Sequence, residues 1–122
     1  MQSAYEIKKY ICEVGHKLYD KGFVAANDGN VSVKLPDGNF MATPTGISKS
    51  FITPDKLVII NSKGEVISGK KGYKPSSEVK MHLRCYAQRD DVGAVVHAHP
   101  PTATGYAVAG KSLDRYPYGA ER

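Results

Sequence analysis

The sequence predicts an α/β fold of three layers (α/β/α), in which helices cover a mostly antiparallel sheet. The first residues have the spacing of an amphipathic helix. Short apolar stretches separated by turn residues follow, and the second half alternates helical and strand patterns. A chain of 122 residues can bury one hydrophobic core, so we expect residues 1–122 to form a single domain.

The first predicted element is a helix. Its apolar residues share one face because they recur at intervals of four, three and four, at Ile7, Ile11, Val14 and Leu18. Ser3 is a suitable N-cap, and Gly22 suits the position after the last turn.

Two hairpins are predicted next. Residues 31–35 alternate apolar and polar side chains, residues 36–39 are a strong turn signal, and residues 40–43 can pair back. Residues 57–61 and 65–68 have the same character and predict a second hairpin.

Between and after the hairpins the signals are helical. Thr53 precedes Pro54 and Asp55, which is the chemistry of a single helical turn. A loop over residues 69–75 leads to a predicted helix over residues 77–88.

Residues 94–101 read Ala-Val-Val-His-Ala-His-Pro-Pro and predict a buried strand that ends in a functional site. Alternate residues of a strand point to the same face, so His97 and His99 are aimed at one point. Pro100 and Pro101 cannot extend a central ladder and leave both rings at the strand end. The pair favours a metal site over the alternative of two polar residues at a loop entrance.

Three other stretches have chemical character. Residues 27–30 (Asn-Asp-Gly-Asn) and 43–49 are rich in small donors and turn formers. Ser76 and Ser77 precede Glu78 at the predicted helix start, where free N–H groups and the helix dipole suit a phosphate. Ordinary turns and helix capping are the alternatives.

Composition narrows the class of function. The chain is 41% hydrophobic and 24% charged, with no apolar membrane-spanning run and no signal peptide, so we expect a cytoplasmic protein without a membrane partner. The two cysteines, Cys12 and Cys85, predict reduced thiols. The net charge is +5, but the basic residues are dispersed, which argues against nucleic acid and favours a small anionic substrate.

Four motifs occur together and in order: Asn-Asp-Gly-Asn-Val-Ser, Thr-Pro-Thr-Gly, Pro-Ser-Ser-Glu and His-Ala-His-Pro. In this combination the chain resembles the class II aldolase and adducin family, from about residue 7 to residue 110. The resemblance implies a class II aldolase-like fold. It also implies that the fold is truncated, since the chain matches only the N-terminal part, roughly the first half, of a family enzyme.

The resemblance also implies roles for individual residues. Five match positions that hold the substrate phosphate: Asn30, Thr45, Gly46, Ser76 and Ser77. Glu78 matches the catalytic general acid/base, and His97 and His99 match two of three Zn²⁺ ligands, with Glu78 as a further possible ligand. The third family histidine comes from a later His-His-Gly segment, and this chain has only His16 and His82 to spare.

The function implied by the resemblance is that of a zinc-dependent sugar-phosphate aldolase, an aldehyde-lyase. Such an enzyme cleaves a ketose phosphate to dihydroxyacetone phosphate and an aldehyde through a zinc-stabilised enediolate. The alternatives are a non-catalytic adducin-like domain or inactive fragment, and a ribulose-phosphate 4-epimerase. The expected partners are a small sugar phosphate, whose identity the sequence does not specify, and further copies of the chain. The second expectation follows because family enzymes are typically homo-oligomers, namely tetramers.

Overall fold

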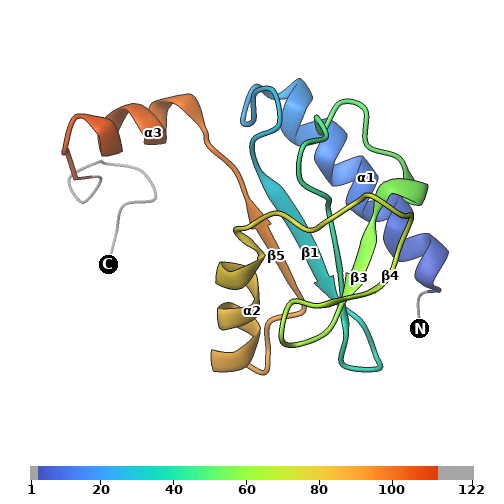
Figure 1. Ribbon diagram of the computed structural model, residues 1–122. Coiled ribbons are helices and arrows are strands. Elements are labelled where there is room, and N and C mark those ends of the chain that lie inside the picture. Colours follow the sequence, from blue (N-terminus) through green and yellow to red (C-terminus); the bar gives the residue numbers. More distant parts are fainter. Residues whose placement is uncertain (1–2, 113–122) are drawn as a thin grey trace.

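The computed structural model describes residues 3–112 and contains an antiparallel sheet with three helices (Figure 1). The sheet order is β4-β3-β2-β1-β5, and every neighbouring pair is antiparallel. The end of the predicted domain, residues 113–122, lies outside the described residues. In chain order the elements are α1 (Ala4–Asp20), β1 (Asn30–Lys34), β2 (Phe40–Ala42), the 3-10 turn η1 (Pro54–Lys56), β3 (Val58–Ile60), β4 (Val66–Ser68), α2 (Val79–Gln88), β5 (Ala94–His97) and α3 (Pro101–Val108).

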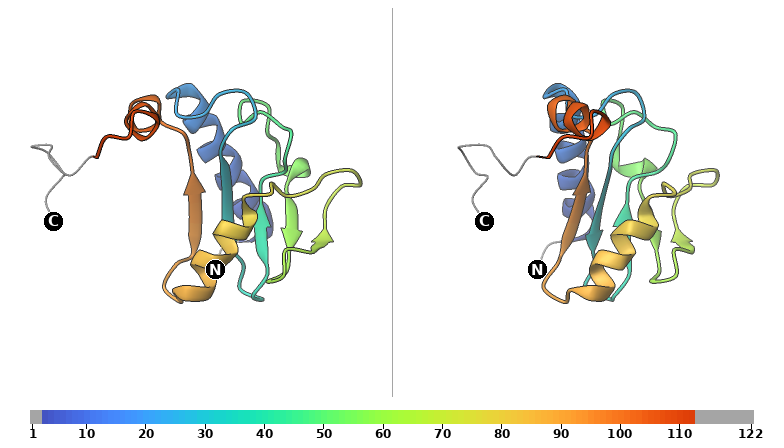
Figure 2. Two further views of the ribbon diagram at one scale, coloured as in Figure 1. Left: turned by 60° about the vertical axis from the view of Figure 1, so that its left-hand side comes forward. Right: turned by 90° about the vertical axis from the view of Figure 1, so that its left-hand side faces the viewer.

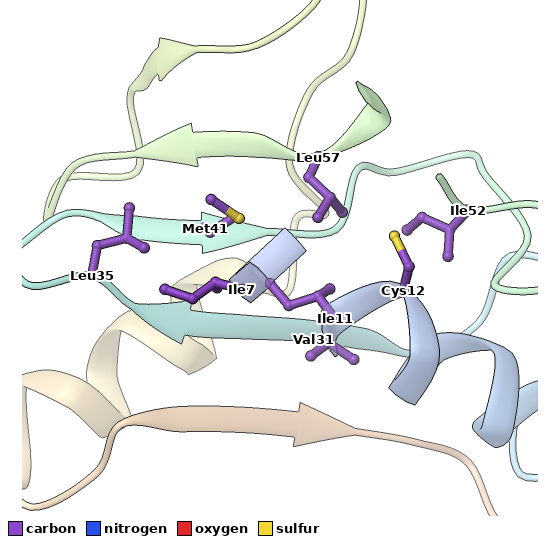
Figure 3. Close-up of a cluster of buried hydrophobic side chains, with 8 residues drawn as sticks. All are labelled: Ile7, Ile11, Cys12, Val31, Leu35, Met41, Ile52 and Leu57. Carbon is purple, nitrogen blue, oxygen red and sulfur yellow. The ribbon is translucent and has the colours of Figure 1, made fainter. Parts of the chain in front are cut away.

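The predicted layers are confirmed, because α1 and α2 cover opposite faces of the sheet (Figure 2). Strand residues alternate between the two faces. Met41 packs toward α1, in the apolar cluster that Figure 3 draws, while its neighbours Phe40 and Ala42 pack toward Tyr86 of α2. The cluster under α1 consists of Ile7, Ile11, Cys12, Val31, Leu35, Met41, Ile52 and Leu57.

The predicted ends of α1 are confirmed. The Ser3 hydroxyl accepts the Glu6 N–H at 3.2 Å, and the Glu6 carboxylate accepts the Ser3 N–H at 3.1 Å. This reciprocal capping box satisfies two N–H groups that the helix itself leaves unpaired. Gly22 follows the last turn with φ of +73°, a conformation that favours glycine.

Both predicted hairpins form. Ser32 pairs with Ala42 across β1 and β2, and the Asp37 carboxylate accepts the Asn39 N–H within the connecting turn. Strands β3 and β4 pair with a register shift at Ile59 and Ile60. The predicted helical turn after Thr53 is η1.

The expectation of a buried strand is wrong for β5. This strand pairs with β1 on one side, and it has no second neighbour among the described strands. Val96, on the face shared with α1, is 52% exposed, because α1 packs over β1 and does not extend across the edge strand. The strand ends at His97, and Pro101 begins α3 four residues later.

Within residues 3–112, none of the helices is both long enough and apolar enough to span a membrane.

Candidate functional site

Three chain segments meet at one end of the sheet. Asn30 is the first residue of β1 and pairs with His97, the last residue of β5. Glu78 stands immediately before α2, on the face of the sheet that α2 covers. His99 follows β5 and is held by a hydrogen bond from its N–H to the Phe23 carbonyl at 2.8 Å.

Glu78, His97 and His99 form a cluster of potential metal ligands. Their ligand atoms all lie within 4.8 Å of one another, and the two imidazole ring centres are 4.8 Å apart in an edge-to-face arrangement. The Nδ1 atom of His97 lies 2.9 Å from the Oε2 atom of Glu78. The two histidines therefore lie close together as expected, although β5 ends at His97 and His99 lies beyond the strand that was predicted to hold both.

The donor set suits Zn²⁺, which binds imidazole nitrogen and carboxylate oxygen. His97 Nδ1 is buried and makes no hydrogen bond of normal geometry, although Glu78 Oε2 is close to it. A buried nitrogen without a hydrogen bond is costly unless another partner satisfies it. A cation bound between His97, Glu78 and His99 would be such a partner, so the residues fit the metal.

Glu78 is held in its charged form. The Asn30 amide donates a hydrogen bond from Nδ2 to Glu78 Oε2 at 2.6 Å, and this bond is the main cause that lowers the pKa of the carboxyl. Desolvation acts in the opposite direction, and the nearby charges of His97 and His99 lower the pKa further. At neutral pH this carboxylate can therefore accept a proton or bind a cation.

A cavity of about 170 Å³ opens beside the cluster. Four of the five residues predicted to hold phosphate line it: Asn30, Thr45, Ser76 and Ser77. Gly46 is not among the lining residues. The two loops of the cavity are joined by a bridge between Pro44 and Pro75 and by a hydrogen bond from the Thr45 N–H to the Lys74 carbonyl at 2.7 Å.

Ser76 makes a local contact and also lines the cavity. Its hydroxyl accepts the Glu78 N–H at 3.2 Å, a local turn bond before α2, whose N-cap residue Glu78 has no side-chain capping hydrogen bond. The same residue lines the cavity, and the Asn30 amide approaches its hydroxyl at 3.4 Å.

Asp28 is a cavity residue that sequence reasoning did not single out. Its carboxylate lies 3.8 Å from His99 Nδ1, and it lines the cavity together with Asn27 and Gly29. The stretch 27–30 was visible as a turn signal, but only the fold brings its acidic residue next to a histidine that follows β5. Among residues 3–112, the lining thus contains two carboxylates, Asp28 and Glu78, and no lysine or arginine.

The two remaining histidines lie apart from the cluster. His16 on α1 interacts through Nε2 with the Ile52 carbonyl at 3.0 Å. His82 on α2 is 1% exposed and contacts Ser32 and Asn30 instead of the cluster. Neither is a member of the metal-ligand group found among residues 3–112.

The sequence profile of the class II aldolase and adducin N-terminal domain matches residues 9–121. The chain belongs to this family. Among curated relatives, it is 40% identical over 97 residues to an L-fuculose phosphate aldolase from Methanococcus maripaludis, covering 79% of this chain and 51% of the relative. It is 35% identical over 98 residues to a 3-oxo-tetronate 4-phosphate decarboxylase from Escherichia coli, covering 80% and 45%.

A solved family structure, YgbL from Klebsiella pneumoniae, superposes with a TM-score of 0.81 at 32% sequence identity. The match covers 88% of this chain and 50% of YgbL. The chain therefore spans about half the length of the family proteins that it matches.

Proposed function

We propose that this chain supplies the metal-binding and phosphate-binding part of a zinc-dependent sugar-phosphate aldolase. The reaction would cleave a ketose phosphate into dihydroxyacetone phosphate and an aldehyde. One observation carries the proposal: the cluster of Glu78, His97 and His99 adjoins a small cavity with Ser76 and Ser77 in its wall. The names of the Methanococcus maripaludis relative, an L-fuculose phosphate aldolase, and of a solved L-fuculose 1-phosphate aldolase support L-fuculose 1-phosphate as the first substrate to test.

Each residue has a role that its chemistry allows. Ser76, Ser77 and Thr45 would donate hydroxyl hydrogen bonds to the phosphate, and Asn30 would stand between the phosphate end and the reacting end of the cavity. Zn²⁺, when bound by His97 and His99 with Glu78 nearby, supplies Lewis-acid chemistry to the oxygens of the sugar. Glu78 is charged at neutral pH, so its carboxylate oxygens would accept a proton from the substrate and return it to the product.

A non-catalytic adducin-like role is the second candidate. It is favoured by the number of imidazole ligands, because catalytic zinc sites have three protein ligands and an open position. Within residues 3–112 the cluster contains two imidazoles, and its third member is the proposed catalytic carboxylate itself. A weakly held metal and no turnover would follow from that arrangement.

Zinc stoichiometry on the 122-residue chain is the first measurement. We expect one equivalent to bind, and binding only at millimolar zinc would favour the non-catalytic candidate. The second measurement uses this chain joined to the remaining half of the Methanococcus maripaludis relative. Dihydroxyacetone phosphate release from L-fuculose 1-phosphate is then followed with and without a chelator.

We expect turnover by the joined protein that is lost with Glu78→Gln and with chelation, and little or no turnover by the 122-residue chain. Glu65→Gln is the matched control, because Glu65 is an exposed carboxylate in the turn before β4. Activity that survives both Glu78→Gln and chelation would overturn the mechanism. A joined protein that binds zinc and phosphate without turnover would support the second candidate.

A further inference from the structure

A continuous row of buried polar side chains runs from α2 to the candidate site. Its four members are 5% exposed or less: Asn30, Ser32, His82 and Tyr86. The Tyr86 hydroxyl lies 2.8 Å from the Ser32 hydroxyl, which lies 2.7 Å from His82 Nδ1. His82 Nε2 contacts Asn30 Oδ1, and Asn30 Nδ2 contacts Glu78 Oε2 at 2.6 Å.

The Glu78 end of this row fixes the direction of its hydrogen bonds. Asn30 Nδ2 donates to the Glu78 carboxylate, whose oxygens accept, so Asn30 Oδ1 faces His82. An amide oxygen can only accept, so with a neutral His82 ring each group of the row donates to the next one toward Glu78.

This direction assigns every proton in the row. Tyr86 donates to Ser32, and Ser32 donates to the unprotonated Nδ1 of His82. The Nε2–H group of His82 donates to Asn30 Oδ1, which leaves the Asn30 amide nitrogen facing Glu78. The reversed row fails at the Glu78 end, because Asn30 Oδ1 would then meet a carboxylate and both groups can only accept.

We propose that His82, as its neutral Nε2–H tautomer, is a positioning residue that holds the Asn30 amide with its nitrogen toward Glu78 and Ser76. The importance of this orientation for ligand binding rests on the proposed function, whereas the orientation itself does not. Burial supports the neutral form, since it is the main cause that lowers the pKa of His82 to about 4. The other causes are the charge of His97, which lowers the pKa, and that of Glu78, which raises it.

The first test needs no variant. Nitrogen-15 NMR of the metal-free 122-residue chain at pH 7 reports which ring nitrogen of His82 carries the proton. We expect Nε2–H together with slow exchange of the Asn30 side-chain NH₂ protons. An Nδ1–H tautomer or an imidazolium at this pH would overturn the proposal.

The second test uses His82→Phe, which keeps a ring and removes both nitrogens, and His82→Gln, which retains an N–H donor. We expect rapid exchange of the Asn30 NH₂ protons in the Phe variant and slow exchange in the Gln variant. The matched control is Leu83→Ala, since Leu83 packs on the same cluster as Tyr86 without belonging to the polar row. Slow exchange in the Phe variant, or equally rapid exchange in Leu83→Ala, would assign His82 a structural role only.

Binding of inorganic phosphate connects the inference to the site. We expect His82→Phe and Asn30→Ala each to weaken phosphate binding by about tenfold, because each removes the same hydrogen bond to a charged group. The double variant should show no additional loss of affinity. Additive losses would overturn the coupling. If the tautomer is Nε2–H but phosphate does not bind the unaltered chain, the proposed function fails and the positioning role stands.

Discussion

Asn30 and His97 are direct partners in the antiparallel ladder between β1 and β5. Directly opposite residues point to the same face of a sheet, here the face that α2 covers. Glu78 precedes α2 and therefore meets both, with its Oε2 atom 2.6 Å from Asn30 Nδ2 and 2.9 Å from His97 Nδ1. A slip of one residue between these strands would turn one of the two side chains to the α1 face and separate the site.

Removal of either cluster histidine should abolish stoichiometric zinc binding. Even outer partners of metal ligands change affinity by about 10-fold to 100-fold, so we expect His97→Ala and His99→Ala each to weaken binding by at least about 100-fold. Isothermal titration calorimetry of the 122-residue chain measures this. His16→Gln is the control and should leave affinity unchanged, since His16 contacts Ile52. Wild-type affinity in both alanine variants would contradict the assigned site.

Phosphate should bind at the start of α2. We expect inorganic phosphate or phosphoglycolate to shift the NMR signals of Ser76 and Ser77, and Ser77→Ala to weaken binding by about tenfold through the loss of one hydrogen bond to a charged group. Ser62→Ala, an exposed serine in the turn between β3 and β4, is the control. Shifts confined to the surroundings of Lys70 and Lys71 would mean nonspecific attraction of the anion.

Asp28 should oppose phosphate. Its carboxylate lines the same cavity, and two unit charges about 4 Å apart in water interact by about 1 kcal/mol. We therefore expect Asp28→Asn to tighten phosphate binding by about fivefold at low ionic strength, less at high salt, in metal-free protein. Asp90→Asn, which removes an exposed carboxylate after α2, should have no such effect. Unchanged affinity in Asp28→Asn would place the bound phosphate away from this residue.

Gly29 should tolerate no side chain. A Cβ at this position would lie 2.5 Å from Val24 Cγ1 and 3.0 Å from the His97 carbonyl oxygen, and φ is +80°. Gly38 has φ of +90° but open space around it, so Gly38→Ala isolates the backbone cost of about 1–2 kcal/mol. We expect Gly29→Ala to cost a further 1–3 kcal/mol or so from overpacking, and to weaken zinc binding as well.

Urea denaturation and zinc titration of both glycine variants provide the measurement. Equal stability losses, with zinc affinity intact in both, would show that the contact between Gly29 and His97 is unimportant.

Burial of neutral His82 should make stability depend on pH. Its pKa is lowered from 6.5 to about 4 in the folded chain, so between these values the unfolded chain binds more protons. The contribution is fully present above about pH 6.5 and is lost as pH falls toward 4, by about 3 kcal/mol at most. Urea denaturation from pH 7.5 to pH 4 should show this loss in the unaltered chain and a smaller one in His82→Phe. Identical pH profiles would contradict the prediction.

Local signals explain why much of the fold could be predicted. The cap at Ser3, the apolar spacing of α1 and the turn residues before β2 act over a few neighbouring residues, and the structure confirms each of them. The edge position of β5 was not predictable from its apolar sequence, because a run such as residues 94–96 reads alike in a central and an edge strand.

The candidate site, like the fold, could be predicted from the sequence only in part. The sequence by itself determined which chemical groups are present: a His-x-His pair at a strand end, hydroxyls at a helix start, and a carboxylate beside them. Only the tertiary structure decided their partners. Asp28 approaches His99, and His82 turns away from the cluster to contact Ser32 and Asn30.

The physical reason is that these contacts depend on long-range strand register and on the packing of α2 against β1. Ser32 and His82 are fifty residues apart, and no local periodicity relates them. Their proximity follows from burying the apolar residues on either side of them, and a buried polar group must then find a partner within reach. The sequence therefore specifies the donors and acceptors, and the packed sheet and helix determine which of them meet.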